Sequence, residues 1–76
     1  MGLVIDAVRL RHQMAIRGLM ARDVAAATGL SAATIAHALS GRPVSACTLR
    51  AIAVALERSQ PLPLADEILA EPGQVP

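Results

Sequence analysis

The 76-residue sequence contains no phenylalanine, tyrosine or tryptophan, although 54% of its residues are hydrophobic. Its core must therefore be built from small and aliphatic side chains, which let helices approach closely but bury little area per residue. A chain of this length makes one small domain whose stability is marginal on its own. The high apolar content indicates either a tight interior or an interface in addition to the core. The lack of aromatic side chains also argues against a substrate pocket.

Cysteine, metal-ligand patterns and long apolar runs are scarce as well. Cys47 is the single cysteine, which excludes an internal disulfide and a paired-cysteine metal motif. His12 and His37 are not spaced with carboxylates or cysteine as metal ligands would be. No signal pattern opens the chain and no apolar run approaches the length of a membrane span. We therefore expect a cytoplasmic protein with no metal and no membrane partner.

Basic and acidic residues occupy different parts of the chain. All seven basic residues are arginines, and the net charge is only +1, a weak electrostatic footprint for a nucleic-acid-binding protein. However, six of the seven arginines lie at or before Arg50, whereas four of the six acidic residues lie at or beyond Glu57. The first part of the chain is thus basic and the tail acidic. No nucleophile–base set, carboxylate pair or glycine-rich phosphate loop is visible, so we expect no catalytic residue, no cofactor and no enzyme activity.

Apolar periodicity and turn residues predict an all-α fold, a compact bundle of about five short helices. The expected helices cover approximately residues 3–17, 21–28, 32–39, 46–57 and 64–70. Gly18 and Gly41 are placed to end helices, Pro43 forbids continuation and Ser45 is placed to cap the fourth helix. We predict one domain over residues 1–70 and a frayed tail over 71–76. The fourth helix is expected to turn four side chains inward, namely Leu49, Ile52, Ala53 and Leu56.

Residues 21–40 fit the twenty-residue helix-turn-helix template, in which two helices joined by a tight turn pack at a steep angle. The template requires apolar residues at its positions 4, 10, 15 and 18, a small residue at position 5 and glycine at position 9. All six requirements are met, by Val24, Leu30, Ile35, Ala38, Ala25 and Gly29. Ser31 follows the turn as a good N-cap for the second helix. Six matches in register predict a helix-turn-helix at 21–40.

Two stretches on either side of this motif indicate which kind of helix-turn-helix protein the chain resembles. The segment LSGRPVSACTLRAIAVAL at 39–56 and the segment MAIRGL at 14–19 resemble the lambda-repressor-like, Cro-type DNA-binding family. The resemblance covers approximately residues 10–56. It implies a bundle of five short helices that binds double-stranded operator DNA, usually as a homodimer, and hence a nucleoid-associated protein. The family commonly has serine or threonine where Met20 stands, so the second helix lacks a good N-cap, and Asp23 in its first turn partly compensates through the helix dipole.

The resemblance and the helical geometry together select the residues expected at the DNA. The outward face of the second template helix should enter the major groove. The family positions that touch base edges correspond to Ser31, Ala32, Ala33 and His37. Many relatives have glutamine or another polar residue at the two positions where alanines stand here, so direct readout should be thin. Phosphate contacts are expected from Arg22, Thr34, Ser40 and Arg42, of which the last two match the family's phosphate-contacting loop.

The segment after Pro61 is too apolar for a free tail. Its leucines and isoleucine are expected to form the dimer contact, to close the core or to hold a partner protein. The residues concerned are Leu62, Leu64, Ile68 and Leu69.

The main functional hypothesis is a sequence-specific transcriptional regulator, a repressor of phage or mobile-element type. The alternative is a protein-binding module on the same fold, such as the antitoxin of a toxin–antitoxin pair. A third hypothesis is a minimal regulator or fragment whose missing part senses a ligand.

Overall fold

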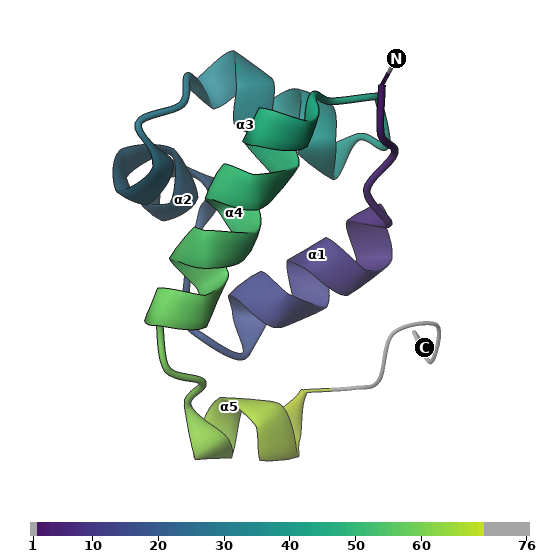
Figure 1. Ribbon diagram of the computed structural model, residues 1–76. Coiled ribbons are helices and arrows are strands. Elements are labelled where there is room, and N and C mark those ends of the chain that lie inside the picture. The colour runs from purple at the N-terminus through teal and green to yellow at the C-terminus, as the bar shows by residue number, and fades with distance from the viewer. Residues whose placement is uncertain (1, 70–76) are drawn as a thin grey trace.

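Five helices make up the computed structural model, which describes residues 2–69. Figure 1 shows four of them gathered around a common centre, with the fifth lying across the end where the first and fourth helices finish. The expected all-α bundle is confirmed, and the expectations for residues 70–76 lie outside the described residues. The helices are α1 (Ala7–Ala15), α2 (Ala21–Thr28), α3 (Ala32–Leu39), α4 (Ala46–Arg58) and α5 (Pro63–Ile68).

Three of the five helices begin with a side-chain cap, whereas α2 begins differently. Asp6, Ser31 and Ser45 each accept a hydrogen bond from the backbone N–H three residues later, at 3.0, 3.1 and 3.1 Å. These caps begin α1, α3 and α4. At the start of α2 the backbone N–H of Met20 donates to Asp23 Oδ2 at 2.7 Å. The carboxylate therefore compensates for the missing cap by a hydrogen bond as well as by its charge.

The turn of the helix-turn-helix depends on Gly29. Its φ is +75°, in the left-handed region where a Cβ is penalised, and its N–H donates to the carbonyl of Ala25 at 2.9 Å. α3 then packs against α2 and α1, and α4 packs against α2. The requirement for glycine at this position is confirmed by the backbone, and the two template helices have the expected bounds.

The expected start of the first helix at residue 3 is wrong, because α1 begins only at Ala7. Leu3 instead pairs with Val44 as an isolated antiparallel bridge, with two backbone hydrogen bonds of 2.8 Å. This pairing satisfies the N–H and C=O of Leu3 outside any helix, and Asp6 caps the first turn. We call residues 2–5 the N-terminal strap. It joins the start of the chain to the loop between α3 and α4.

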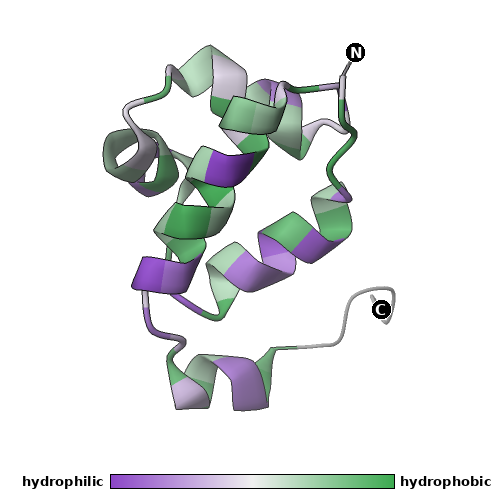
Figure 2. Cartoon of the chain, viewed as in Figure 1, coloured by the Kyte–Doolittle hydropathy of each residue, from purple (hydrophilic) through white to green (hydrophobic). Residues whose placement is uncertain are grey.

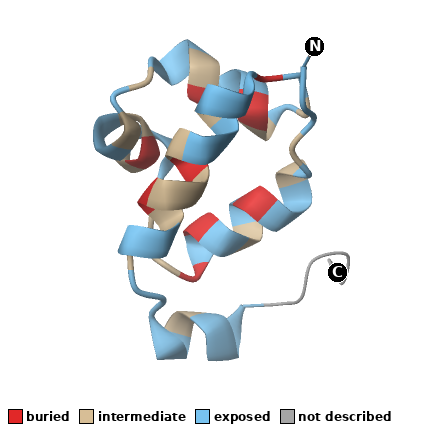
Figure 3. Ribbon diagram, viewed as in Figure 1, coloured by how far each residue is buried: buried red, intermediate tan, exposed pale blue. Residues whose placement is uncertain are grey.

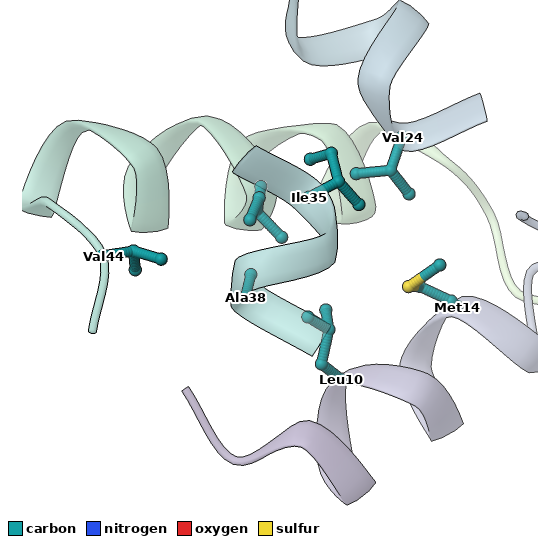
Figure 4. Close-up of a cluster of buried hydrophobic side chains, with 7 residues drawn as sticks. Leu10, Met14, Val24, Ile35, Ala38 and Val44 are labelled. Atoms are coloured by element: carbon teal, nitrogen blue, oxygen red, sulfur yellow. The ribbon is translucent and has the colours of Figure 1, made fainter. Parts of the chain in front are cut away.

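The core lies where α1, α2, α3 and α4 meet. Ile35 and Ala38 are 1% and 0% exposed, so α3 is covered along its whole inner face (Figures 3 and 4). The expectation that Leu49 faces inward is wrong, since it is 37% exposed, whereas Ala55, on another side of α4, is buried. Leu49 lies at the edge of the inner face of α4, beside α1. The buried cluster consists of Leu10, Met14, Val24, Ile35, Ala38, Val44 and Ile52.

α5 adds little to this core. Leu62, Leu64 and Ile68 are 51%, 66% and 77% exposed, and Leu69 is exposed as well. Apolar residues appear at both ends of the helix in Figure 2, with polar residues between them. Core closure by these side chains is therefore not found within the single chain, and a contact with a second molecule stays a prediction.

Arg17 fastens the end of α1 to the end of α4. Its Nε donates to the carbonyl oxygens of Leu56 and Ser59, at 2.8 and 2.9 Å, and the site is partly buried. Leu56 lies in the last turn of α4, and Ser59 is the residue that follows the helix. The Leu56 carbonyl also accepts from the N–H of Ser59 at 3.1 Å, so Arg17 adds a charged donor at a helix end where few N–H groups are left. The guanidinium of Arg17, in the turn after α1, thus acts as a C-terminal cap of α4.

We expect Arg17→Ala to lower the free energy of unfolding by about 1–3 kcal/mol, because it leaves helix-end carbonyls without their charged donor. Arg22→Ala is the matched control, since this exposed arginine makes no side-chain hydrogen bond within residues 2–69. The control should stay within about 0.5 kcal/mol of the parent chain. Urea unfolding followed by circular dichroism measures both. Equal effects of the two substitutions would contradict the capping role of Arg17.

Candidate nucleic-acid interface

One face of α3 is exposed over its whole length. Ser31, Ala32, Ala33 and His37, the four residues expected to face bases, are all exposed. The opposite face, which carries Ile35, is buried against the core. Since an α-helix turns about 100° per residue, burial of one stripe presents the other stripe to solvent. The structure therefore brings the four residues together on one accessible surface, which we call the α3 face.

The hydroxyls at the start of α3 are already hydrogen-bonded within the chain. Ser31 Oγ accepts from the N–H of Thr34 at 3.1 Å, and the two hydroxyl oxygens lie 2.9 Å apart. Thr34 is half-buried. Ser31 thus serves first as a helix cap, which sequence reasoning treated as separate from its expected contact with a base. Within residues 2–69, the side chain of His37 makes no hydrogen bond, so it is the free polar group of the α3 face.

The loop after α3 is held by its own hydrogen bonds. Ser40 Oγ donates to the carbonyl of His37 at 2.9 Å, and the N–H of Arg42 donates to the same carbonyl at 3.0 Å. A phosphate oxygen accepts hydrogen bonds only, so Ser40 must give up this bond to donate to DNA. The strap residue Leu3 fixes the far side of the loop by pairing with Val44. Arg42 therefore projects from a loop whose backbone is fixed on both sides.

Arg22 and Arg42 are the expected phosphate contacts whose side chains are available. Both residues are exposed, and neither forms an ion pair or a side-chain hydrogen bond within the described part of the chain. Arg22 lies in the first turn of α2, and Arg42 follows the end of α3. One exposed arginine thus lies at the start of α2 and another just after α3, where each is available for a phosphate contact.

Residues 2–69 show neither a metal-binding cluster nor a membrane-spanning helix. This range contains no group of three or more histidine, cysteine, aspartate and glutamate side chains that could hold a metal ion. None of the helices within it combines the length and the apolar character that a membrane span requires. The α3 face, with Arg22 and Arg42, is therefore the candidate site of this protein.

The strap is the structural contributor that sequence reasoning missed. The helix expected over residues 3–17 includes Leu3, which the structure places in the strap instead. The signal that could have corrected this is Asp6, because an aspartate directly before an apolar periodic segment is a typical N-cap.

Comparison with known proteins identifies the family. No curated protein and no solved structure matches the chain significantly. A family model described as a helix-turn-helix domain matches residues 7–64, which run from the start of α1 into α5. The match covers most of the chain and includes both template helices and the exposed α3 face. The chain belongs to the helix-turn-helix domain family, whose motif is a DNA-binding element.

Proposed function

We propose that the protein is a sequence-specific transcriptional regulator that places α3 in the major groove of operator DNA. The observation that carries this proposal is the exposed α3 face, together with the exposed Arg22 and Arg42, which form no ion pair within residues 2–69. An α-helix fits the major groove, and arginines on either side can neutralise phosphates. The resemblance to Cro-type proteins supports a repressor of phage or mobile-element type that binds its operator as a homodimer.

The chemistry of the α3 face predicts how sequence is recognised. Ala32 and Ala33 offer methyl groups that can contact the methyl group of thymine, but they have no hydrogen-bonding group. Ser31 is engaged in capping α3. Hydrogen-bond recognition of bases therefore depends on His37, and selectivity should depend further on the shape and deformability of the DNA.

We expect His37→Ala to reduce discrimination between operator and random DNA more than it reduces non-specific affinity. One good base contact contributes about 1–3 kcal/mol of discrimination, whereas non-specific binding comes from phosphate contacts. The operator is first obtained by selection from genomic fragments and footprinting. Competition binding of the parent and the variant on operator and random duplexes at matched salt then gives the ratio of affinities. An unchanged ratio would show that His37 does not read bases.

Arg42→Ala should instead weaken binding to all sequences by a similar factor. Removal of one phosphate contact should lower the slope of log affinity against log salt by about one unit. Arg58→Ala is the matched control, because Arg58 is also exposed but lies in the last turn of α4 and not in α3 or the loop after it. Fluorescence anisotropy over a series of salt concentrations measures both slopes. Equal slopes for the two variants would remove Arg42 from the interface.

The exposed apolar side chains of α5 favour a second candidate function. An antitoxin-type module uses such a surface to hold a partner protein, and Leu64 and Ile68 are exposed enough to do so. The two functions are separated by a gel shift on the DNA upstream of the gene and by inspection of the adjacent reading frame. Specific retardation without a toxin-like neighbour favours the regulator, whereas a toxin-like neighbour whose product binds the chain favours the antitoxin.

A further inference from the structure

A hollow of about 520 Å³ lies between the end of α2 and the length of α4, two helices that are neighbours in Figure 1. We call it the α2–α4 hollow. Its apolar wall consists of short aliphatic side chains, including Ala27, Ala51 and Val54. Pockets that bind small molecules have volumes of about 300–1,000 Å³ and combine an apolar wall with a few polar groups that orient the ligand. The α2–α4 hollow therefore has the size and the wall of such a pocket.

Two arginines give the α2–α4 hollow a positive charge. Arg50 and Arg58 line it, and both residues are exposed. None of its lining residues is acidic, and neither arginine forms an ion pair or a side-chain hydrogen bond within residues 2–69. Figure 2 shows two hydrophilic bands on α4 with hydrophobic turns between them. Because a guanidinium group binds a carboxylate through two parallel hydrogen bonds, the hollow is suited to an anion.

The acidic residues nearest to the α2–α4 hollow in sequence do not neutralise these arginines. Asp23 lies one helical turn before Ala27, but its Oδ2 accepts from the N–H of Met20 at 2.7 Å, at the start of α2. Glu57 precedes Arg58 in α4, yet it does not line the hollow. Neither carboxylate forms an ion pair with an arginine within the described part of the chain. The positive charge of the hollow is therefore available to a ligand.

A second hollow, of about 290 Å³ between α1 and α4, differs in its charge. Asp6 and Arg9 both line it and form an exposed ion pair, with 3.8 Å between Asp6 Oδ2 and Arg9 Nε. The two charges cancel there. Of the two hollows, the α2–α4 hollow is thus the one that favours an anion.

The remaining features of the α2–α4 hollow narrow the chemistry of the ligand. Two hydroxyl groups that line it are occupied, since Thr28 Oγ1 donates to the carbonyl of Val24 at 2.7 Å and Ser59 Oγ donates to the carbonyl of Ala55 at 3.2 Å. The two guanidinium groups are thus the main polar groups for recognition. The sequence has no aromatic side chain, so the wall presents methyl groups and no flat ring for stacking. An aliphatic body fits this wall better than an aromatic one.

We infer that the α2–α4 hollow binds an aliphatic carboxylate, whose charged end is held by Arg50 and Arg58 and whose chain lies against the apolar wall. The two arginines are eight residues apart, which corresponds to about 12 Å along the axis of α4. A chain of several carbons can therefore extend along the wall between them. None of the lining residues belongs to α3 or to the loop after it. The site is thus separate from the proposed DNA interface, and it can be tested without DNA.

NMR titration of the full chain with octanoate, a soluble aliphatic carboxylate, tests the site. The amide signals that shift most should be those of residues 27–28 and 47–59, which line the hollow. Arg50→Gln and Arg58→Gln should each weaken binding by about threefold, because each removes one charged partner of the carboxylate. Arg9→Gln is the matched control, because it removes the same charge outside this hollow. It should leave the affinity for octanoate close to that of the parent chain.

Two further ligands and one further variant separate charge from apolar character. Octylammonium has a similar chain and the opposite charge, so it should not bind. Acetate has the charge without the long chain and should bind at least about tenfold more weakly than octanoate, because it buries less apolar area. Ala27→Glu places a carboxylate of the chain itself in the hollow and should abolish binding of octanoate.

Four results would overturn the inference. They are the absence of amide shifts with monomeric octanoate, shifts that are largest in α1, binding of octylammonium as tight as that of octanoate, and equal effects of Arg9→Gln and the two α4 variants. Shifts in α1 would indicate the hollow between α1 and α4 instead. Circular dichroism shows whether each variant is folded, and the substituted arginines are all exposed. Each of these results concerns the anion site alone, because the proposed function is tested by DNA binding.

Discussion

Ile35→Ala is expected to lower the free energy of unfolding by about 2–5 kcal/mol, since it removes a fully buried aliphatic side chain and leaves a cavity. Ile35 is 1% exposed and lies in the cluster where α3 meets its neighbours. Domains of this kind have total stabilities of about 5–15 kcal/mol, so this one substitution removes a large share. The core contains no aromatic side chain that could move in and fill the space.

Two comparisons make this measurement specific. Ile35→Val removes one methylene at the same position and should cost about 0.5–1.5 kcal/mol. Val8→Ala removes aliphatic carbons from a side chain that is 54% exposed, and its effect should stay near that of other surface changes, within about 0.5 kcal/mol. Urea unfolding gives all three values. If Ile35→Ala costs no more than Val8→Ala, the assigned packing of α3 is wrong.

Ala33→Glu is expected to reduce affinity for operator and random DNA alike by about a hundredfold or more, because a carboxylate facing phosphates costs several kcal/mol. Ala33 is exposed near the start of α3, so the substitution leaves the core unchanged. Glutamate is also a good helix former and favours the first turn of a helix. The melting temperature should therefore stay close to that of the parent chain while DNA binding is lost.

Ala27→Glu is the matched control for this second prediction. Ala27 is an exposed alanine near the end of α2. It lines the α2–α4 hollow and is not part of the α3 face. It introduces the same charge and should weaken DNA binding only slightly. Fluorescence anisotropy at one salt concentration compares the two variants. If both weaken binding equally, the net charge of the protein matters and the α3 face does not.

The helix-turn-helix could be predicted from sequence because its determinants are local. Gly29 is required by the left-handed turn, Ser31 caps the helix that follows, and the spacing of Val24 and Ile35 places them on inner faces. Each of these signals acts over a few residues. The start of α1 could not be predicted in the same way. Leu3 lies outside the helix because its backbone pairs with Val44, in the loop before α4. Such long-range pairing leaves no periodic signal.

For the candidate site, the exposure of the residues could be predicted from sequence, but their hydrogen bonds could not. Exposure of Ser31, Ala32, Ala33 and His37 follows from burial of the opposite face of α3, and the structure shows that exposure. The hydrogen bonds that occupy the hydroxyls of Ser31 and Ser40 could not be derived from spacing alone, because each depends on the rotamer chosen near a helix end. Whether these residues contact DNA stays a prediction.

The pairing of Leu3 with Val44 allows one part of the protein to open locally, at a lower free energy than global unfolding requires. The two hydrogen bonds join the N-terminal strap to the loop that carries Arg42, and the helical hydrogen bonds do not depend on them. Local opening of the strap can therefore expose the amide of Val44 to solvent exchange while the amides of α3 stay protected. If Arg42 binds a DNA phosphate, the loop that carries it is held more firmly, and local opening of the strap should become less frequent. Hydrogen exchange at this single amide would then report occupancy of the phosphate contact from a position that touches no nucleotide.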